Sequence, residues 1–196
     1  AANNEAVSGE AQTPTQICQN ATPAQTPSNR TFAAYPDMIL QPDIDYRAVM
    51  CTGAGPVYVD LFEDLTPITV NSFVFLAKKG FFDGVTFHRV VKGFVIQAGD
   101  PTGSGSGGPG YSTKDEPNQL TNERGTLAMA KASGASEFGS QFFINLKDNP
   151  SLDQDAPNQK RFYPFGQVTK GMDVVNQIKQ GDKIQSVTIV ETAQGQ

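Results

Sequence analysis

The sequence lacks tryptophan, contains a single histidine, and carries fewer basic than acidic residues. Its 196 residues include 15 lysines and arginines against 20 aspartates and glutamates, and the formal net charge is -5. The basic residues are scattered, so no positive patch of the kind that binds nucleic acid is predicted. No apolar run approaches the roughly 20 residues needed to span a bilayer. We therefore predict a soluble domain that binds neither nucleic acid nor membrane, with Asp115 and Glu116 as solvated charges.

The single histidine argues against a metal centre. A protein zinc site needs several ligands at regular spacing, and no cluster of cysteine, histidine or carboxylate residues accompanies His88. We expect His88 to be a hydrogen-bonded core residue. The glycine-rich run at residues 102–110 lacks the Lys-Ser/Thr pair and the strand-loop-helix setting of a phosphate loop. We interpret this run as a mobile surface loop, and no metal or other cofactor is predicted.

The two cysteines, Cys18 and Cys51, allow two interpretations. They are either unrelated thiols or a disulfide that ties the N-terminal segment to the domain in an oxidising compartment. Such a bond stabilises a fold by roughly 3.5 kcal/mol for a loop of this length when only chain entropy is counted. The chain begins Ala-Ala-Asn-Asn without methionine, as a mature or trimmed product would. We expect an extracytoplasmic protein, whether periplasmic, secreted or lumenal.

Residues 1–36 differ in composition from the rest of the chain. They are rich in alanine, glutamine, threonine, asparagine and proline, and their apolar side chains show no period. Such a segment cannot bury enough surface to offset the entropy that is lost when it becomes ordered. We predict a largely irregular extension, either a linker or an arm draped over the domain. Residues 37–196 suffice for one domain that buries its own core.

Within that domain, short strands and two helices are predicted. Thr66 as the cap and Pro67 as the first residue predict a helix over residues 67–79, and an apolar residue at every third position predicts another over 172–180. Alternation of apolar and polar residues and short apolar runs predict strands at residues 46–51, 57–61, 86–89, 94–98, 126–130, 141–146, 163–168 and 186–190. Periodicity alone does not decide between a barrel and a sandwich.

Two stretches combine polar side chains with an apolar floor. In FHRVVKGFVIQAGD (residues 87–100), Arg89 and Gln97 stand among apolar residues just before the glycine-rich run. LAMAKA and GSQFFI (residues 127–132 and 139–144) add another amide, Gln141, beside a phenylalanine. Together with FGQV at residues 165–168, these stretches resemble the cyclophilin family of peptidyl-prolyl cis/trans isomerases, over about residues 57–191. The resemblance implies an all-β fold, a closed eight-stranded antiparallel β-barrel capped by two α-helices.

The resemblance also implies roles for individual residues. Arg89 matches the catalytic arginine, and Gln97 matches the glutamine that helps to position the substrate backbone and the arginine. The substrates implied are proline-containing polypeptides, no cofactor is required, and we expect a monomer. The residues that match the substrate-binding positions are Phe94, Val95, Ala130, Lys131, Gln141, Phe143, Leu152 and Phe162.

The chain departs from the family pattern at several of these positions. Ser151 stands where cyclosporin-sensitive members carry tryptophan, so we predict weak cyclosporin binding with catalysis retained. The family's histidine aligns with Phe162, and Tyr163 is the alternative because Pro164 can shift the register. Lys131 replaces the common asparagine, but main-chain groups make most of that contact.

Three functions are compatible with these features. The first is an isomerase that assists the folding of exported proteins. The second is a proline-segment-binding module or chaperone with little turnover, and the third is a small-molecule-binding barrel with an open apolar lumen. Arg89 favours the first, because a pure binder needs the pocket but not the donor. Bulky residues that are expected to point inward, such as Phe73 and Phe142, argue against an open lumen.

Overall fold

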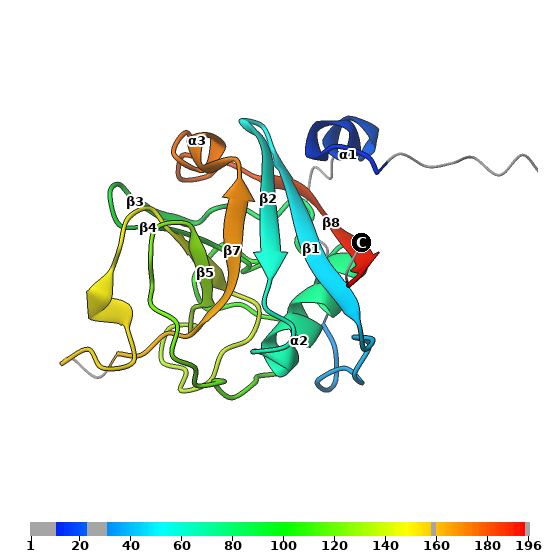
Figure 1. Cartoon of the computed structure of the whole chain (residues 1–196). Coiled ribbons are helices and arrows are strands. Elements are labelled where there is room, and N and C mark those ends of the chain that lie inside the picture. Colours follow the sequence, from blue (N-terminus) through cyan, green and yellow to red (C-terminus); the bar gives the residue numbers. More distant parts are fainter. Residues whose placement is uncertain (1–10, 23–30, 158–159, 195–196) are drawn as a thin grey trace, which may run out of the picture.

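The computed structural model describes residues 11–22, 31–157 and 160–194, and eight strands in these residues form one antiparallel sheet (Figure 1). The strand order is β3-β4-β6-β5-β7-β2-β1-β8. The strands are β1 (Ile44–Thr52), β2 (Gly55–Leu61), β3 (Arg89–Val91), β4 (Val95–Ala98), β5 (Thr126–Met129), β6 (Phe142–Asn145), β7 (Pro164–Lys170) and β8 (Ile184–Ala193). The helices are α1 (Pro14–Asn20), α2 (Pro67–Lys78) and α3 (Met172–Val175), with a 3₁₀ turn η1 (Pro150–Leu152).

The sheet curls into a half-barrel whose edge strands, β3 and β8, do not pair with each other in the described residues. Irregular segments join across this seam instead, because the Gly84 N–H donates to the Ile184 carbonyl oxygen at 2.7 Å and the Phe87 N–H donates to that of Asp182 at 2.8 Å. The prediction of eight antiparallel strands with helical caps is confirmed, although "closed" overstates it. The seam stays open because β3 has only three residues. The N–H of Val90 in β3 donates to the side chain of Gln180 at 3.4 Å instead of to a neighbouring strand.

Aromatic rings fill the interior of the half-barrel. Phe73 of α2 has its ring centroid 5.0 Å from that of Phe82, 5.7 Å from that of Phe142 and 5.4 Å from that of Phe165. Phe87 is fully buried in the same cluster. Burial of aromatic side chains of this size provides much of the hydrophobic stabilisation of a small domain. The filled interior excludes the small-molecule-binding barrel that the sequence left open.

Helix α2 covers one end of the half-barrel behind the sheet (Figure 1), and its N-terminus is capped in an unexpected way. The Thr66 hydroxyl does not cap the helix but donates to the Phe62 carbonyl oxygen at 3.0 Å. The carboxylate of Glu116 accepts the free N–H groups of Ile68 and Thr69 at 3.0 and 2.6 Å. Glu116 is therefore not a solvated charge, because it neutralises the positive end of the helix from 47 residues away in sequence.

Several element boundaries differ from the sequence prediction. The strand expected at residues 86–89 begins at Arg89, and Thr86 makes only an isolated bridge to Lys183. The helix expected over 172–180 ends as α3 at Val175, and turns follow. Glycine-rich and short segments make such ends hard to place from periodicity alone. Within the described ranges, no helix has the length and apolar character that a membrane span requires.

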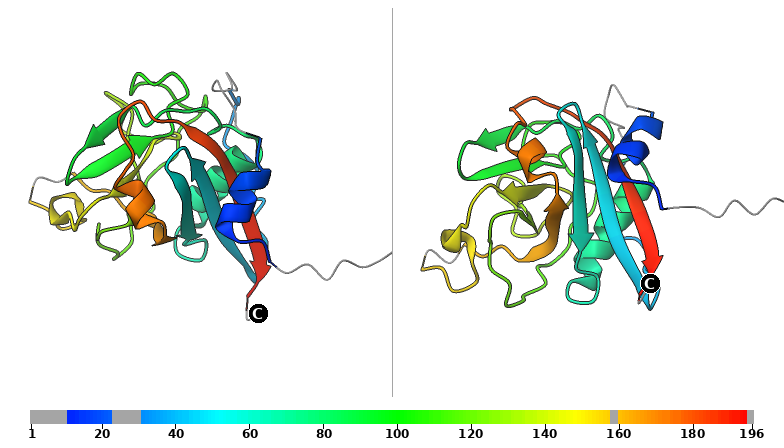
Figure 2. Two further views of the ribbon diagram at one scale, coloured as in Figure 1. Left: turned by 90° about the horizontal axis from the view of Figure 1, so that it is seen from above. Right: turned by 45° about the horizontal axis from the view of Figure 1, so that its top comes forward.

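Helix α1 of the N-terminal extension lies against the outside of the half-barrel, where it packs beside β1 and β2 (Figure 2). Cys18 in α1 and Cys51 in β1 form a disulfide with their Cα atoms 5.4 Å apart, so the bonded interpretation is correct. The sequence prediction of a largely irregular extension did not anticipate α1. The helix begins at a reciprocal pair of hydrogen bonds between Thr13 and Gln16, a capping box without any apolar period.

A second anchor fixes the end of the extension. Phe32 packs on Phe75 and Phe81, with ring centroids 5.0 and 6.5 Å apart, and its N–H donates to the Pro109 carbonyl oxygen at 2.8 Å. The described parts of the extension thus contact the domain, as expected for a draped arm.

Candidate active site

The predicted site lies on the outer face of the sheet, opposite the main core. Successive side chains of a strand point to opposite faces, so Ile96 and Ile144 enter the main core while their neighbours Val95 and Phe143 face outward. Ala130 and Ala128 belong to the same outer group. These residues form a second, smaller apolar cluster, packed against the partly buried side chains of Phe94, Leu152 and Phe162.

A pocket of about 380 Å³ opens above this cluster. All of the predicted catalytic and substrate-binding residues except Gln141 line it. Ser151 and Lys160 also contribute, and Lys160 was not anticipated because it lies in a loop without any recognisable pattern. The full lining is Arg89, Phe94, Val95, Gln97, Ala130, Lys131, Phe143, Ser151, Leu152, Lys160 and Phe162.

Strand register places the polar residues of the pocket directly beside its apolar floor. Arg89 of β3 is paired with Gln97 of β4, and Gln97 is paired with Phe143 of β6. Phe143 in turn is paired with Ala128 of β5. Neighbouring strands are about 4.8 Å apart, so these four residues form one row across the sheet. The Arg89 side chain is exposed at the end of this row, next to the opening of the pocket.

A chain of amides holds Gln97 in place. The Gln97 Nε2 donates to Gln141 Oε1 at 3.0 Å, and the Gln141 Nε2 donates to the Gly107 carbonyl oxygen at 3.0 Å. Gln141 therefore lies behind the pocket and orients Gln97. These hydrogen bonds link the row of paired residues to the glycine-rich run.

The glycine-rich run is tied to one carboxylate. Asp100 is fully buried and accepts the N–H groups of Thr102, Gly105 and Gly107 at 2.7, 2.6 and 3.1 Å. Burial alone raises the pKa of Asp100, but the hydrogen bonds from Thr102, Gly107 and Gly105 outweigh it and hold the pKa below its ordinary value of 3.8. A Cβ on Gly107 would lie 2.1 Å from Asp100 Oδ1, so this position requires glycine. The run is thus wrapped around Asp100.

The far wall of the pocket is aromatic. The ring of Phe162 meets that of Phe143 edge to face, with centroids 5.5 Å apart. The Phe162 N–H donates to the Leu152 carbonyl oxygen at 3.0 Å, which joins the two wall residues. Of the two alternatives for this position, Phe162 lines the pocket and Tyr163 is not among the lining residues.

Comparison with known proteins identifies the family. The profile described as "cyclophilin type peptidyl-prolyl cis-trans isomerase/CLD" matches residues 47–194. The chain belongs to the cyclophilin family. Among its relatives is a peptidyl-prolyl cis-trans isomerase of Helicobacter pylori, 43% identical over 144 residues that cover 71% of this chain and 84% of that protein. Another, from Synechococcus elongatus, is 42% identical over 149 residues that cover 75% of this chain and 98% of the relative.

Solved cyclophilins share the fold. A cyclophilin-type peptidyl-prolyl cis-trans isomerase of Cryptosporidium parvum superposes with a TM-score of 0.66 at 28% identity and covers 76% of this chain and 99% of its own. A second crystal structure of that protein, in the presence of the dipeptide Ala-Pro, gives 0.66 at 29% identity. The predictions of the family, of a cyclophilin-like fold and of peptidyl-prolyl isomerase activity are confirmed.

Lys131, one of the positions where this cyclophilin departs from the family pattern, is held by an ion pair. Its Nζ lies 2.7 Å from Asp115 Oδ2, and both side chains are partly buried. Asp115 is therefore not simply a solvated charge. The Ala130 N–H donates to the Gln141 carbonyl oxygen at 2.9 Å, which keeps this edge of the pocket in register with β6.

His88 precedes Arg89 in the chain but does not line the pocket. Burial, the largest cause, lowers its pKa below the ordinary value of 6.5, although the charge of Asp100 acts in the opposite direction. In the parts of the chain that the structure describes, no three potential metal ligands come together around it or elsewhere.

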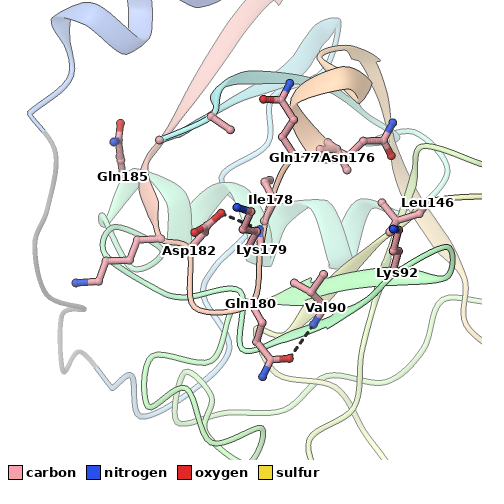
Figure 3. A pocket seen from close by; sticks show the side chains of 14 residues that line it. Val90, Lys92, Leu146, Asn176, Gln177, Ile178, Lys179, Gln180, Asp182 and Gln185 are labelled. Atoms are coloured by element: carbon pink, nitrogen blue, oxygen red, sulfur yellow. Dashed lines mark hydrogen bonds between the residues drawn. The ribbon is translucent and has the colours of Figure 1, made fainter.

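A larger hollow of about 1000 Å³ lies at the open seam, between β3 and the segment that follows α3 (Figure 3). Side chains such as Lys92, Asn176 and Gln177 line it, and none of the predicted site residues does. Gln180 reaches across it to the Val90 N–H. The smaller pocket on the outer face is the candidate active site, because it combines Arg89 with an apolar floor.

Proposed function

We propose that this pocket binds the proline of a polypeptide substrate and that Arg89 is the donor that promotes rotation of the preceding peptide bond. Rotation about a peptide bond meets a barrier of about 18–20 kcal/mol, because resonance between nitrogen and carbonyl must be broken. In the twisted state the prolyl nitrogen regains its lone pair. A donor aimed at that nitrogen stabilises the transition state more than the ground state, and each tenfold in rate requires about 1.4 kcal/mol.

The observation that carries the proposal is the row of paired residues Arg89, Gln97 and Phe143. It places a guanidinium, which offers several donors in a rigid fork, directly beside an apolar pocket that fits a proline ring. The reaction needs neither a nucleophile nor a proton shuttle. The pocket also limits access of water to the amide, which strengthens the hydrogen bond that Arg89 makes.

The remaining residues orient the substrate. Phe94, Val95, Leu152 and Phe162 surround the ring, and Gln97 positions both Arg89 and the substrate backbone. The main chain at Ala130 binds the substrate backbone as an adjacent strand would. The related protein whose structure was determined in the presence of Ala-Pro supports a proline ligand of this class.

The test is the exchange rate of an X-Pro peptide measured by NMR with the intact protein. Uncatalysed exchange takes tens to hundreds of seconds, so catalysis is readily detected. We expect accelerated exchange together with chemical-shift changes at the rings of Phe94, Phe143 and Phe162. Acceleration without changes at these rings would place the activity elsewhere. Clear binding without acceleration would favour the alternative, a proline-segment-binding module.

The cellular role that we propose is assistance to the folding of exported proteins in an extracytoplasmic compartment, with the protein acting as a monomer. The disulfide between Cys18 and Cys51 supports this location, because disulfides persist mainly in oxidising compartments. Slow X-Pro exchange limits the folding of many polypeptides, so an isomerase is useful there. Fractionation of cells that express the protein from its own gene tests the location, and recovery with cytosolic markers would refute it.

A further inference from the structure

The candidate pocket is built from two kinds of structure. Its floor, Val95 and Phe143, lies in strands, where ladder hydrogen bonds fix each side chain. Its walls, Phe94, Leu152 and Phe162, lie in loops or turns before β4, in η1 and before β7. Sheet pairing reaches only Phe94, whose carbonyl oxygen accepts the Leu146 N–H at 2.9 Å at the end of the β4–β6 ladder, and it does not hold Leu152 or Phe162. Another set of contacts must therefore set the distance between Phe94 and the other two walls.

Three buried asparagines connect the walls from behind. Asn122, Asn145 and Asn149 are 1%, 0% and 2% exposed. The Asn149 Nδ2 donates to the Phe94 carbonyl oxygen at 3.0 Å and to Asn145 Oδ1 at 2.8 Å. The Asn145 Nδ2 donates to Asn122 Oδ1 at 3.1 Å, and the Asn122 Nδ2 donates to the Phe162 carbonyl oxygen at 3.0 Å. One continuous chain of amides thus runs from one wall of the pocket to the other.

Main-chain hydrogen bonds of the same asparagines also connect the third wall residue, Leu152, to this chain of amides. The Leu152 N–H donates to the Asn149 carbonyl oxygen at 2.9 Å, and the Asn149 N–H donates to that of Asn122 at 2.8 Å. Two further acceptors bind the remaining Nδ2 hydrogens of Asn122 and Asn145. Asn122 Nδ2 also donates to Asp153 Oδ1 at 3.0 Å, and Asn145 Nδ2 to Thr126 Oγ1 at 2.8 Å.

Both hydrogens of every amide in this chain are therefore used. A buried polar group that loses its partner costs about 1–3 kcal/mol, so a shift of one wall would leave donors or acceptors unpaired. A buried network whose donors are all satisfied favours one arrangement over several. The chain consequently fixes the separation of Phe94 and Phe162.

We propose that Asn149, with Asn122 and Asn145, is a positioning residue of the isomerase site, which sets the pocket width that proline requires. This inference rests on the assignment of the pocket as the proline site in the preceding subsection. Arg89 is not part of this chain of amides, because the pairing of β3 with β4 sets its position. Loss of Asn149 should therefore weaken substrate binding while the catalytic donor remains in place.

The experiment compares Asn149→Ala with Asn71→Ala in the full chain. Asn71 is the matched control, because it is 0% exposed and its Nδ2 also donates to a carbonyl oxygen, that of Asp37, at 3.1 Å. Asn71 joins α2 to residues 35–39 and does not line the pocket. Peptide exchange yields kcat and KM, and urea unfolding measures the stability of each variant. The wild type and Arg89→Ala belong to the same series.

We expect Asn149→Ala to raise KM by about tenfold, since small displacements within a binding site have effects of this order, with kcat within about twofold of the wild type. Asn71→Ala should lose a similar amount of stability with KM unchanged. Equal KM values for both variants would overturn the proposal. If Asn149→Ala does not fold, Asn149→Ser, which keeps one donor, is measured against the same outcomes. Absence of catalysis by the wild type, or full activity of Arg89→Ala, would instead refute the proposed function.

Discussion

The guanidinium of Arg89 lies at the end of a row of paired residues that continues through Gln97 to the apolar Phe143 and Ala128. Its neighbours form the apolar floor and walls of the pocket. In the mechanism that we propose, these neighbours bind the proline ring and Arg89 is the donor to the twisted amide. The predictions at this scale therefore concern single side chains of the pocket.

Ser151 provides the first prediction at the scale of single residues. It lines the pocket where the family's cyclosporin-sensitive members carry tryptophan, so the wall presents little apolar area. We expect weak cyclosporin binding by the wild type. Ser151→Trp should tighten binding by at least about tenfold, because a buried tryptophan contributes 150–250 Å² of contact area.

Isothermal titration of both proteins with cyclosporin measures this difference, and the peptide exchange rate should change little in the variant. Nanomolar affinity of the wild type would contradict this interpretation of Ser151.

At the scale of elements, hydrogen bonds connect the glycine-rich run both to the buried Asp100 and to the candidate pocket. Asp100 gathers its N–H groups, and the Gly107 carbonyl oxygen accepts from Gln141, which orients Gln97. On the other side of the pocket, the buried asparagines Asn122, Asn145 and Asn149 likewise hold loop residues by hydrogen bonds. In both places a buried polar group replaces the ladder hydrogen bonds that a loop lacks.

Asp100 gives a prediction of pH dependence. Its folded-state pKa lies below 3.8, so the folded protein binds fewer protons than the unfolded chain near that pH. Its contribution to stability is therefore fully present above pH 3.8 and is lost as the pH falls through the folded-state value.

The Asp100→Asn variant tests this linkage. We expect it to lose about 2 kcal/mol of unfolding free energy at pH 7, as hydrogen bonds to a charged group contribute, and to differ less from the wild type in acid. Urea unfolding from pH 2 to 7 measures both. A constant difference across this range would exclude the role of the charge.

The difference between paired strands and loops also explains which parts of the site the sequence could predict. Arg89, Gln97, Val95 and Phe143 lie on paired strands, where alternation and motif spacing place each side chain on a known face. Phe162 was recognised by its distance from the FGQV motif. The Glu116 cap joins groups 47 residues apart, and the chain of asparagines joins groups as far apart as 55 residues. Such contacts leave no local period, and only the folded chain brings them together.

The described residues of the extension are fastened to this domain by the disulfide, by Phe32 and by Tyr35, whose hydroxyl donates to the Ile68 carbonyl oxygen at 2.7 Å. None of these residues lines the candidate pocket. The sequence correctly indicated that a disulfide was possible, whereas α1 depends on a local capping box and on the bond to β1. At this scale the extension contributes to stability, and the active site should function without that contribution.

Cys18→Ser tests this separation and leaves the buried Cys51 unchanged. The disulfide closes a loop across 33 residues, so its loss should lower the free energy of unfolding by about 3.5 kcal/mol when only chain entropy is counted. We expect kcat/KM within about twofold of the wild type. Urea unfolding and peptide exchange measure the two quantities, and reduction of the wild type should reproduce the variant. A large fall in kcat/KM with the fold intact would connect the extension to the site.

In the proposed mechanism, Arg89 promotes rotation and does not merely help to bind the substrate. The most direct measurement is the NMR exchange rate of one X-Pro peptide with the wild type, with Arg89→Ala, and with Arg124→Ala as a control for an exposed arginine outside the pocket. We predict that Arg89→Ala lowers kcat by about 10²–10³-fold, the effect of removing one preorganised donor, while peptide affinity changes little and Arg124→Ala remains fully active. Unchanged exchange with Arg89→Ala would contradict the account.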